Sequence, residues 1–204
     1  MVHQSQDQGQ QQGQMPSAQQ FGAHELLDAD EALGTLVGGI EHYSLYDEFV
    51  QDKRLKTILQ RQKGALIQLY NTILDTLKSG QDPAVKTQTY MMEQQNTQTT
   101  FGMQPGTPTT PAQSSSEFND ECISSAMITQ LKAIASDFTL AALEATHPVL
   151  RRIFADSVPN IIEMGYEVFL YQNEKQYYEV PQLAQQDMQA IIQSYAQAPN
   201  QMPH

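Results

Sequence analysis

The feature that most constrains the fold of this chain is the stretch 117–182, where two helical patterns flank Thr146-His147-Pro148. Apolar residues recur every three or four positions on both sides of this tripeptide, which is typical of amphipathic helices. Proline is well tolerated in the first turn of a helix, since its fixed φ suits the helix and its missing N–H costs nothing. We therefore expect Pro148 to begin the second helix, with Thr146 or His147 as its cap.

These two helices predict an antiparallel hairpin that needs a partner, because neither helix can bury its apolar stripe alone. The first stripe consists of Ile123, Met127, Leu131, Ile134, Phe138, Ala142 and Ala145. The second consists of Leu150, Phe154, Val158, Ile161, Gly165, Val168 and Phe169.

The partner is a second predicted hairpin at 23–80. Its first helix should bury Leu26, Leu33, Leu36, Ile40, Tyr43 and Val50. Asp52 is a good N-cap for its second helix, and Lys78-Ser79-Gly80 is a typical stop, because a cation near the helix end is followed by glycine. That second helix should bury Leu55, Ile58, Leu59, Leu66, Leu69, Ile73 and Leu77. Glycines 34, 38 and 39 each weaken the first helix by ~1 kcal/mol against Ala. They either allow close helix approach, which we favour, or mark a local inconsistency.

The segment 81–116 joins the two hairpins. Pro105, Pro108 and Pro111 interrupt it, so no long helix is expected there. Its length can return the chain along a whole bundle, as in ferritin-like folds, or can join two separable hairpins. We prefer one bundle, because each hairpin alone leaves an apolar face exposed. The predicted fold is therefore an all-α, four-helix, ferritin-like bundle with a long crossover. The apolar residues that could dock on its flank are Tyr90, Met91, Met92, Phe101 and Met103.

Both ends of the chain are rich in glutamine. Nine of the 30 Gln lie in the first twenty residues, and 1–22 is predicted to be a disordered tail because it has almost no apolar content. The segment 183–198 carries a weak amphipathic pattern and predicts a short helix that docks on the bundle. A disordered tail, 199–204, is expected beyond it.

The charge of the chain limits its partners. Acidic residues outnumber basic ones 23 to 11, for a formal net charge of -12, so we expect no nucleic-acid partner and no adsorption on anionic lipid. No apolar run is long enough to span a bilayer and no signal peptide is evident, which favours synthesis in the cytoplasm. The lone Cys122 excludes an intramolecular disulfide and is expected to be a small apolar residue of its helix.

The sequence predicts no catalytic site, no metal site and no cofactor. Di-metal sites in four-helix bundles need a Glu-x-x-His motif on each of two helices, and the chain has only Glu144-x-x-His147, at a predicted turn. Residues 163–166, at the matching position of the fourth helix, include no His. Glu41 and His42 are adjacent, so they point about 100° apart on a helix. No phosphate-binding loop or zinc spacing is present.

The fourth helix carries the candidate interaction surface. Pro159 falls in its middle and should kink it. The aromatic residues around it exceed what one narrow core stripe uses, so some should face a partner or the crossover, unless the buried face is wide. They are Tyr166, Phe169, Tyr171, Tyr177 and Tyr178.

The stretches ATHPVLRRIF and DSVPNIIEMGYEVFLYQNEKQYYEVPQLAQQDMQ resemble the spore coat protein F family of spore-forming Firmicutes. YMMEQQNTQTTFGMQPGTPTTP resembles the upstream part of its longer members. The resemblance implies a ferritin-like bundle and a structural role in the spore coat, with other coat proteins and further copies of the chain as partners. Two alternatives stay open, a ferritin-like metal-dependent oxidoreductase and an adaptor that recruits coat proteins. The abundant Gln and Tyr leave two interpretations open: solubilising low-complexity tails, which we favour, and a substrate for enzymatic or oxidative cross-linking.

Overall fold

The computed structural model describes residues 21–94, 97–106 and 108–198. These residues form helices and connections without a strand: α1 (Ala23–Phe49), α2 (Lys53–Ser79), the short 3-10 helix η1 (Ser115–Glu117), α3 (Asp120–Glu144), α4 (Pro148–Glu174) and α5 (Gln185–Gln193). The predicted tails lie outside the described residues, apart from residues 21 and 22.

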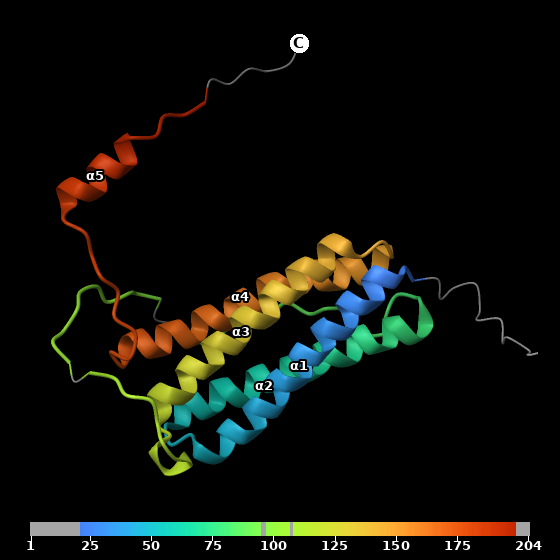
Figure 1. The fold of residues 1–204 in the computed structure, drawn as a ribbon, viewed down its shortest axis with the longest axis horizontal. Coiled ribbons are helices and arrows are strands. Elements are labelled where there is room, and N and C mark those ends of the chain that lie inside the picture. Colours follow the sequence, from blue (N-terminus) through green and yellow to red (C-terminus); the bar gives the residue numbers. More distant parts are fainter. Residues whose placement is uncertain (1–20, 95–96, 107, 199–204) are drawn as a thin grey trace, which may run out of the picture.

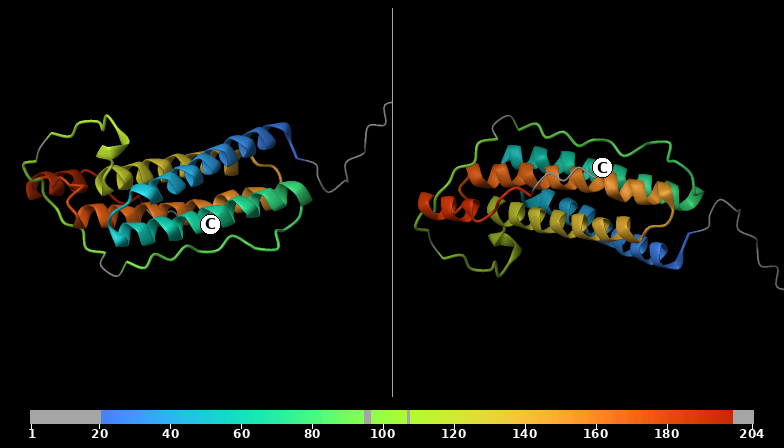
Figure 2. Two further views of the ribbon diagram at one scale, coloured as in Figure 1. Left: turned by 90° about the horizontal axis from the view of Figure 1, so that it is seen from below. Right: turned by 90° about the horizontal axis from the view of Figure 1, so that it is seen from above.

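The four long helices form one bundle (Figure 1). Both α1 and α4 pack against α2 and α3, and every packed pair runs antiparallel. The crossover returns along the outer side of α2 and α4 over the length of the bundle (Figure 2). The predicted all-α, four-helix bundle with a long crossover is therefore confirmed.

The helix ends follow from local chemistry. The Asp52 carboxylate accepts hydrogen bonds from the N–H groups of Arg54, at 2.8 Å, and Leu55, at 3.3 Å, and so caps α2 as predicted. Gly80 ends α2 with a φ of 65°, which glycine adopts at little cost. Pro148 is the first residue of α4, and His147 caps it by accepting from Leu150 N–H at 3.4 Å. These predictions are confirmed.

The apolar core fills the space between the four helices, with one shift from the prediction on α1. Leu26 is 43% exposed, while the buried face carries the small residues Ala29, Ala32 and Gly39 beside Leu36 and Tyr43. A Cβ on Gly39 would lie 3.0 Å from Ile134 Cδ1 of α3, whereas at Gly34 and Gly38 it would meet open space. The predicted close approach therefore holds at Gly39 alone.

Two further predictions are wrong or partly wrong. The helix α5 has no buried residue, so it does not dock on its own bundle. In the crossover, Tyr90 and Met92 contact the core, but Met91, Phe101 and Met103 are exposed. The apolar character of a crossover residue does not determine whether it docks. Docking also requires a surface of the bundle to contact at that position.

Within residues 21–94, 97–106 and 108–198, no helix combines the length and the apolar character needed to cross a membrane.

Candidate functional site

Three polar side chains along α4 hold the backbone of the crossover. Asn160 accepts from Tyr90 N–H at 2.8 Å and donates to Gln88 C=O at 2.9 Å. Two turns on, the Glu167 carboxylate accepts from Glu93 N–H at 3.2 Å. Asn173 then accepts from Thr100 N–H at 2.7 Å and donates to its C=O at 3.0 Å. Asn160 and Glu167 lie seven residues apart and share a face of α4, whereas Asn173 lies near the end of the helix. Together the three side chains bind the crossover at three levels.

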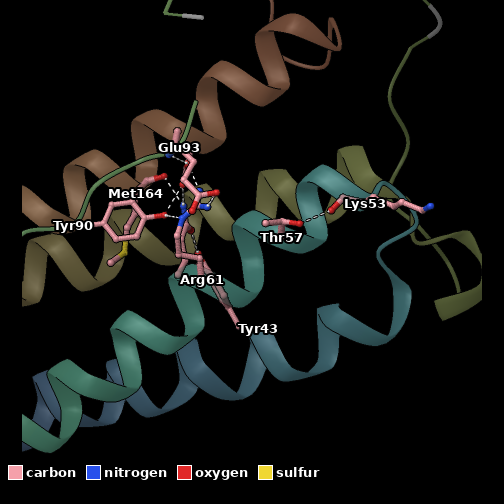
Figure 3. Close-up of polar contacts among 9 residues, drawn as sticks. Tyr43, Lys53, Thr57, Arg61, Tyr90, Glu93 and Met164 are labelled. Carbon is pink, nitrogen blue, oxygen red and sulfur yellow. Dashed lines mark hydrogen bonds and ion pairs between the residues drawn. The ribbon is translucent and has the colours of Figure 1, made fainter. Parts of the chain in front are cut away.

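The middle level is a buried polar cluster around Glu167, which is 1% exposed. Figure 3 shows its members Arg61, Tyr90 and Glu93. Its Oε2 accepts from the Tyr90 hydroxyl at 2.5 Å and from Gln62 Nε2 at 3.2 Å. Its Oε1 pairs with the Arg61 guanidinium and accepts from Glu93 N–H. All four lone-pair positions of the carboxylate are thus occupied, and any further ligand would have to displace a partner.

Residues of three helices and of the crossover complete this cluster. Arg61 of α2 also donates to the Tyr90 hydroxyl at 3.1 Å and pairs with the Glu93 carboxylate at 2.6 Å. Gln62 accepts from the hydroxyl of the fully buried Tyr43 at 2.9 Å and donates to Met164 C=O at 3.0 Å. The cluster therefore ties α1, α2, α4 and the crossover together.

The protonation of Tyr90 suits this arrangement. Burial raises the pKa of Tyr90 far above its ordinary value, and the neighbouring Glu167 carboxylate raises this pKa further. The phenol therefore keeps its proton at neutral pH and can act as a hydrogen-bond donor. Such an arrangement stabilises the fold and offers no nucleophile or free base for chemistry.

At both ends of the bundle, an acidic residue from one hairpin binds the turn of the other. Asp120, in the first turn of α3, accepts from the N–H groups of Gln51, at 2.9 Å, and Asp52, at 3.1 Å. Glu25, in the first turn of α1, is 2% exposed and accepts from the N–H groups of Thr146 and His147, both at 2.8 Å. Each hairpin turn thus depends on the opposite hairpin for its polar partners.

Glu25 is also bound by Thr146 Oγ1 at 3.0 Å and by Gly22 N–H at 2.5 Å. Burial by itself would raise the pKa of this carboxyl, but the hydrogen bonds from His147, Gly22 and Thr146 outweigh it, and the pKa lies below its ordinary value of 4.5. The folded chain therefore stabilises the charged form of Glu25.

The residues considered for metal binding have other roles or lie at the surface. His147 caps α4 and contacts the Phe21 ring, Glu144 is exposed, and His42 hydrogen-bonds with Gln130 at 3.2 Å. In the part of the chain that the structure describes, no group of three or more His, Cys, Asp or Glu side chains is arranged to hold a metal ion. Cys122, expected as a small apolar residue of its helix, is exposed.

The structure divides the predicted interaction surface. Pro159 is exposed, and α4 continues through it. Tyr171 is fully buried, so its place in that surface is corrected: the segment after α4 folds back here and covers the helix end. Tyr177 is half-buried, with its ring centroid 6.3 Å from that of Tyr171.

The other predicted aromatic residues share one apolar groove between α3 and α4. The Phe169 ring stacks on Tyr166, with 5.9 Å between centroids, and meets Tyr178 edge-on at 5.3 Å. The groove has a volume of about 340 Å³. Its lining is Ile128, Leu131, Lys132, Ala135, Ile161, Ile162, Gly165, Tyr166, Phe169 and Tyr178. Lys132 is the one charged residue among them, so the groove suits an apolar segment of a binding partner.

The sequence reasoning did not single out Glu25, Asn160, Glu167 or Asn173. The available signal was the seven-residue spacing of Asn160 and Glu167, which places both on one face of α4. A polar residue in such a pattern looks like a solvated position until its distant partners are known.

Comparison with known proteins assigns these features to a family. The Coat F domain matches residues 119–181, which include the whole lining of the groove. The chain is 41% identical over 182 residues to Spore coat protein F-like protein YhcQ of Bacillus subtilis (strain 168), covering 89% of this chain and 83% of that protein. A crystal structure of a proposed spore coat protein from Bacillus halodurans shares the fold, with a TM-score of 0.59 and 16% identity, over 80% of this chain and 95% of that one. The chain therefore belongs to the spore coat protein F-like family, and its α3–α4 hairpin is the Coat F domain.

Proposed function

We propose that this protein is a non-catalytic structural component of the bacterial spore coat, assembled there with other coat proteins. The observation that carries the proposal is the 41% identity to a spore coat protein F-like protein across nearly the whole chain. The occupied lone pairs of Glu25 and Glu167 are consistent with it, because both buried carboxylates are committed to the fold.

Location in the sporulating cell tests the proposal. A full-length fluorescent fusion, expressed from its own promoter, should form a shell around the developing spore and remain with purified spores. The matched control is the fluorescent protein alone, expressed from the same promoter, which should stay in the mother-cell cytoplasm. Diffuse signal that never concentrates at the spore would remove the coat assignment.

A metal-dependent oxidoreductase of the ferritin-like type is the alternative from another class. It predicts stoichiometric iron or manganese in protein purified without chelator, and a rise in Tm when Fe²⁺ is added, because ligands that bind only the folded state stabilise it. We expect neither result. Two bound metal ions per chain would favour the alternative.

A further inference from the structure

The helix α5 is an amphipathic helix without a partner in its own chain. Its apolar residues Met188, Ile191 and Ile192, followed by Tyr195, recur at the spacing of one helical face. Ile192 is 71% exposed and no residue of α5 is buried. A helix of nine residues is marginal in water by itself, so an apolar surface that covers this face would also stabilise the helix.

The α3–α4 groove fits this helix in length and chemistry. Along α4 the groove extends from Ile161 to Phe169, about 12 Å at 1.5 Å per residue, and α5 is about 14 Å long by the same measure. Ile162, in the groove, is 60% exposed. In a chain of net charge -12, the groove presents Lys132, and α5 carries Asp187 one residue before its apolar face.

The connection to α5 is short, and no residue of α5 lines the groove of its own chain. Gly102 N–H donates to Val180 C=O at 2.9 Å, and Gln104 N–H donates to the Glu179 carboxylate at 2.8 Å. These bonds hold the chain against the crossover, so only 181–184, about 13 Å when fully extended, remain before α5. Pro181 stiffens this short link, and α5 stands clear of the bundle (Figure 1).

We propose that α5 of one copy of this chain binds in the α3–α4 groove of a second copy, with the face formed by Met188, Ile191 and Ile192 against Tyr166 and Phe169. Helix-in-groove binding of this kind uses an amphipathic helix as the ligand and an apolar groove as the receptor. Each copy carries both parts, so the same contact closes a dimer when it is reciprocal and extends a chain of copies when it is not. Self-association is measured on the purified protein, so its failure would leave the proposed coat location untouched, and the reverse also holds.

Two variants separate the two halves of the contact. Ile191→Glu with Ile192→Glu places two charges on the apolar face of α5. Gln186→Glu with Gln193→Glu adds the same charges to the opposite face and is the matched control. Gly165→Phe fills the groove, since a Cβ at Gly165 meets open space. Its control is Gly64→Phe on the exposed face of α2, where a Cβ also meets open space.

Light scattering after size exclusion, at several concentrations, should show that the full-length chain and both controls associate. Each disabling variant should weaken self-association at least tenfold, because apolar anchors at the centre of an interface carry most of its affinity. A mixture of the two disabling variants should form a one-to-one complex, since one supplies an intact helix and the other an intact groove.

Three results would overturn the inference: a wild-type chain that stays monomeric, disabling variants that associate like their controls, or a mixture that forms no complex. Docking of α5 in the groove of its own chain would give the first result. If Gly165→Phe does not fold, as judged by its circular dichroism, Lys132→Glu replaces it, and Asp187→Lys in the other copy should restore the association.

Discussion

At the scale of single residues, the molecule depends on carboxylates whose every lone pair is used. Glu167 joins α2, α4 and the crossover, and Glu25 joins the start of α1 to the α3–α4 turn. The exposed pair between Arg54 and Glu174, at 2.8 Å, contributes far less, because ion pairs in water contribute about 0–1 kcal/mol. Burial and multiple donors therefore distinguish Glu25 and Glu167 from the acidic residues that cover the surface.

Replacing Glu167 by Gln should lower the free energy of unfolding by about 3 kcal/mol, the size expected when one member of a buried ion pair is removed. The new amide group would also place N–H donors against those of Arg61 and the backbone of Glu93. Urea unfolding followed by circular dichroism measures the loss. Glu163→Gln, one turn earlier on α4 and half-buried, is the control, and equal losses in the two variants would contradict the role of the cluster.

The pKa of Glu25 predicts a stability change in acid. Because its pKa is lower in the folded chain than its ordinary value of 4.5, the folded state holds the proton less tightly than the unfolded state. Its contribution is therefore complete above that value and is lost as the pH falls through the lower, folded pKa. The Tm of the wild type should exceed that of Glu25→Gln at neutral pH, and this difference in Tm should narrow in acid. A difference of constant size would refute this account.

At the scale of elements, helix boundaries could be predicted because the residues that set them are local. Asp52, Gly80 and Pro148 act through their own backbone or the next few residues, so the printed sequence contains the whole cause. The buried polar residues could not be found in this way. Glu25 and Thr146 are 121 residues apart, and neither looks unusual before the fold brings them together.

The predictions for the aromatic surface and for the docking of α5 were partly wrong for the same reason, because both depend on contacts with distant parts of the chain. Four consecutive residues, 170–173, are buried at the end of α4, since the returning chain covers the side that an isolated amphipathic helix would expose. The apolar pattern at 183–198 correctly indicated a helix. It could not indicate which surface that helix contacts, because periodicity carries no information about the partner.

The close contact of α1 with α3 predicts opposite responses at neighbouring glycines. Gly38→Ala should stabilise the chain by about 0.5–1 kcal/mol, because alanine favours the helix and its Cβ meets open space. At Gly39 the same change places a Cβ 3.0 Å from Ile134, which is fully buried and has little room to move. Gly39→Ala should therefore be less stable than Gly38→Ala by at least about 1 kcal/mol in thermal unfolding. A gain of equal size at both positions would show that α3 yields to the added methyl group.

At the scale of the whole molecule, the two hairpins are mutually dependent. Asp120 completes the α1–α2 turn and Glu25 completes the α3–α4 turn, so each turn would lose these hydrogen bonds if the hairpins were separated. The apolar core is likewise shared by all four helices. The Coat F domain, at residues 119–181, is therefore half of a folding unit in this chain.

This dependence predicts one cooperative unfolding transition. Hydrogen exchange measured by mass spectrometry in increasing urea should show peptides of α1–α2 and of α3–α4 losing protection at the same concentration, as in a two-state domain. The comparison of peptides within one sample serves as its own control. Loss of protection in α3–α4 at a clearly different concentration would mean that the hairpins unfold separately.

The three-level attachment of the crossover to α4 has a consequence for damage to the chain. A single cut between Pro108 and Ser114, in an exposed part of the crossover, would leave Asn160 and Glu167 bound to the segment before the cut. The four helices would still share their core, so the two fragments would separate only in a denaturing gel. A protein cleaved in this way would keep its fold and could still function.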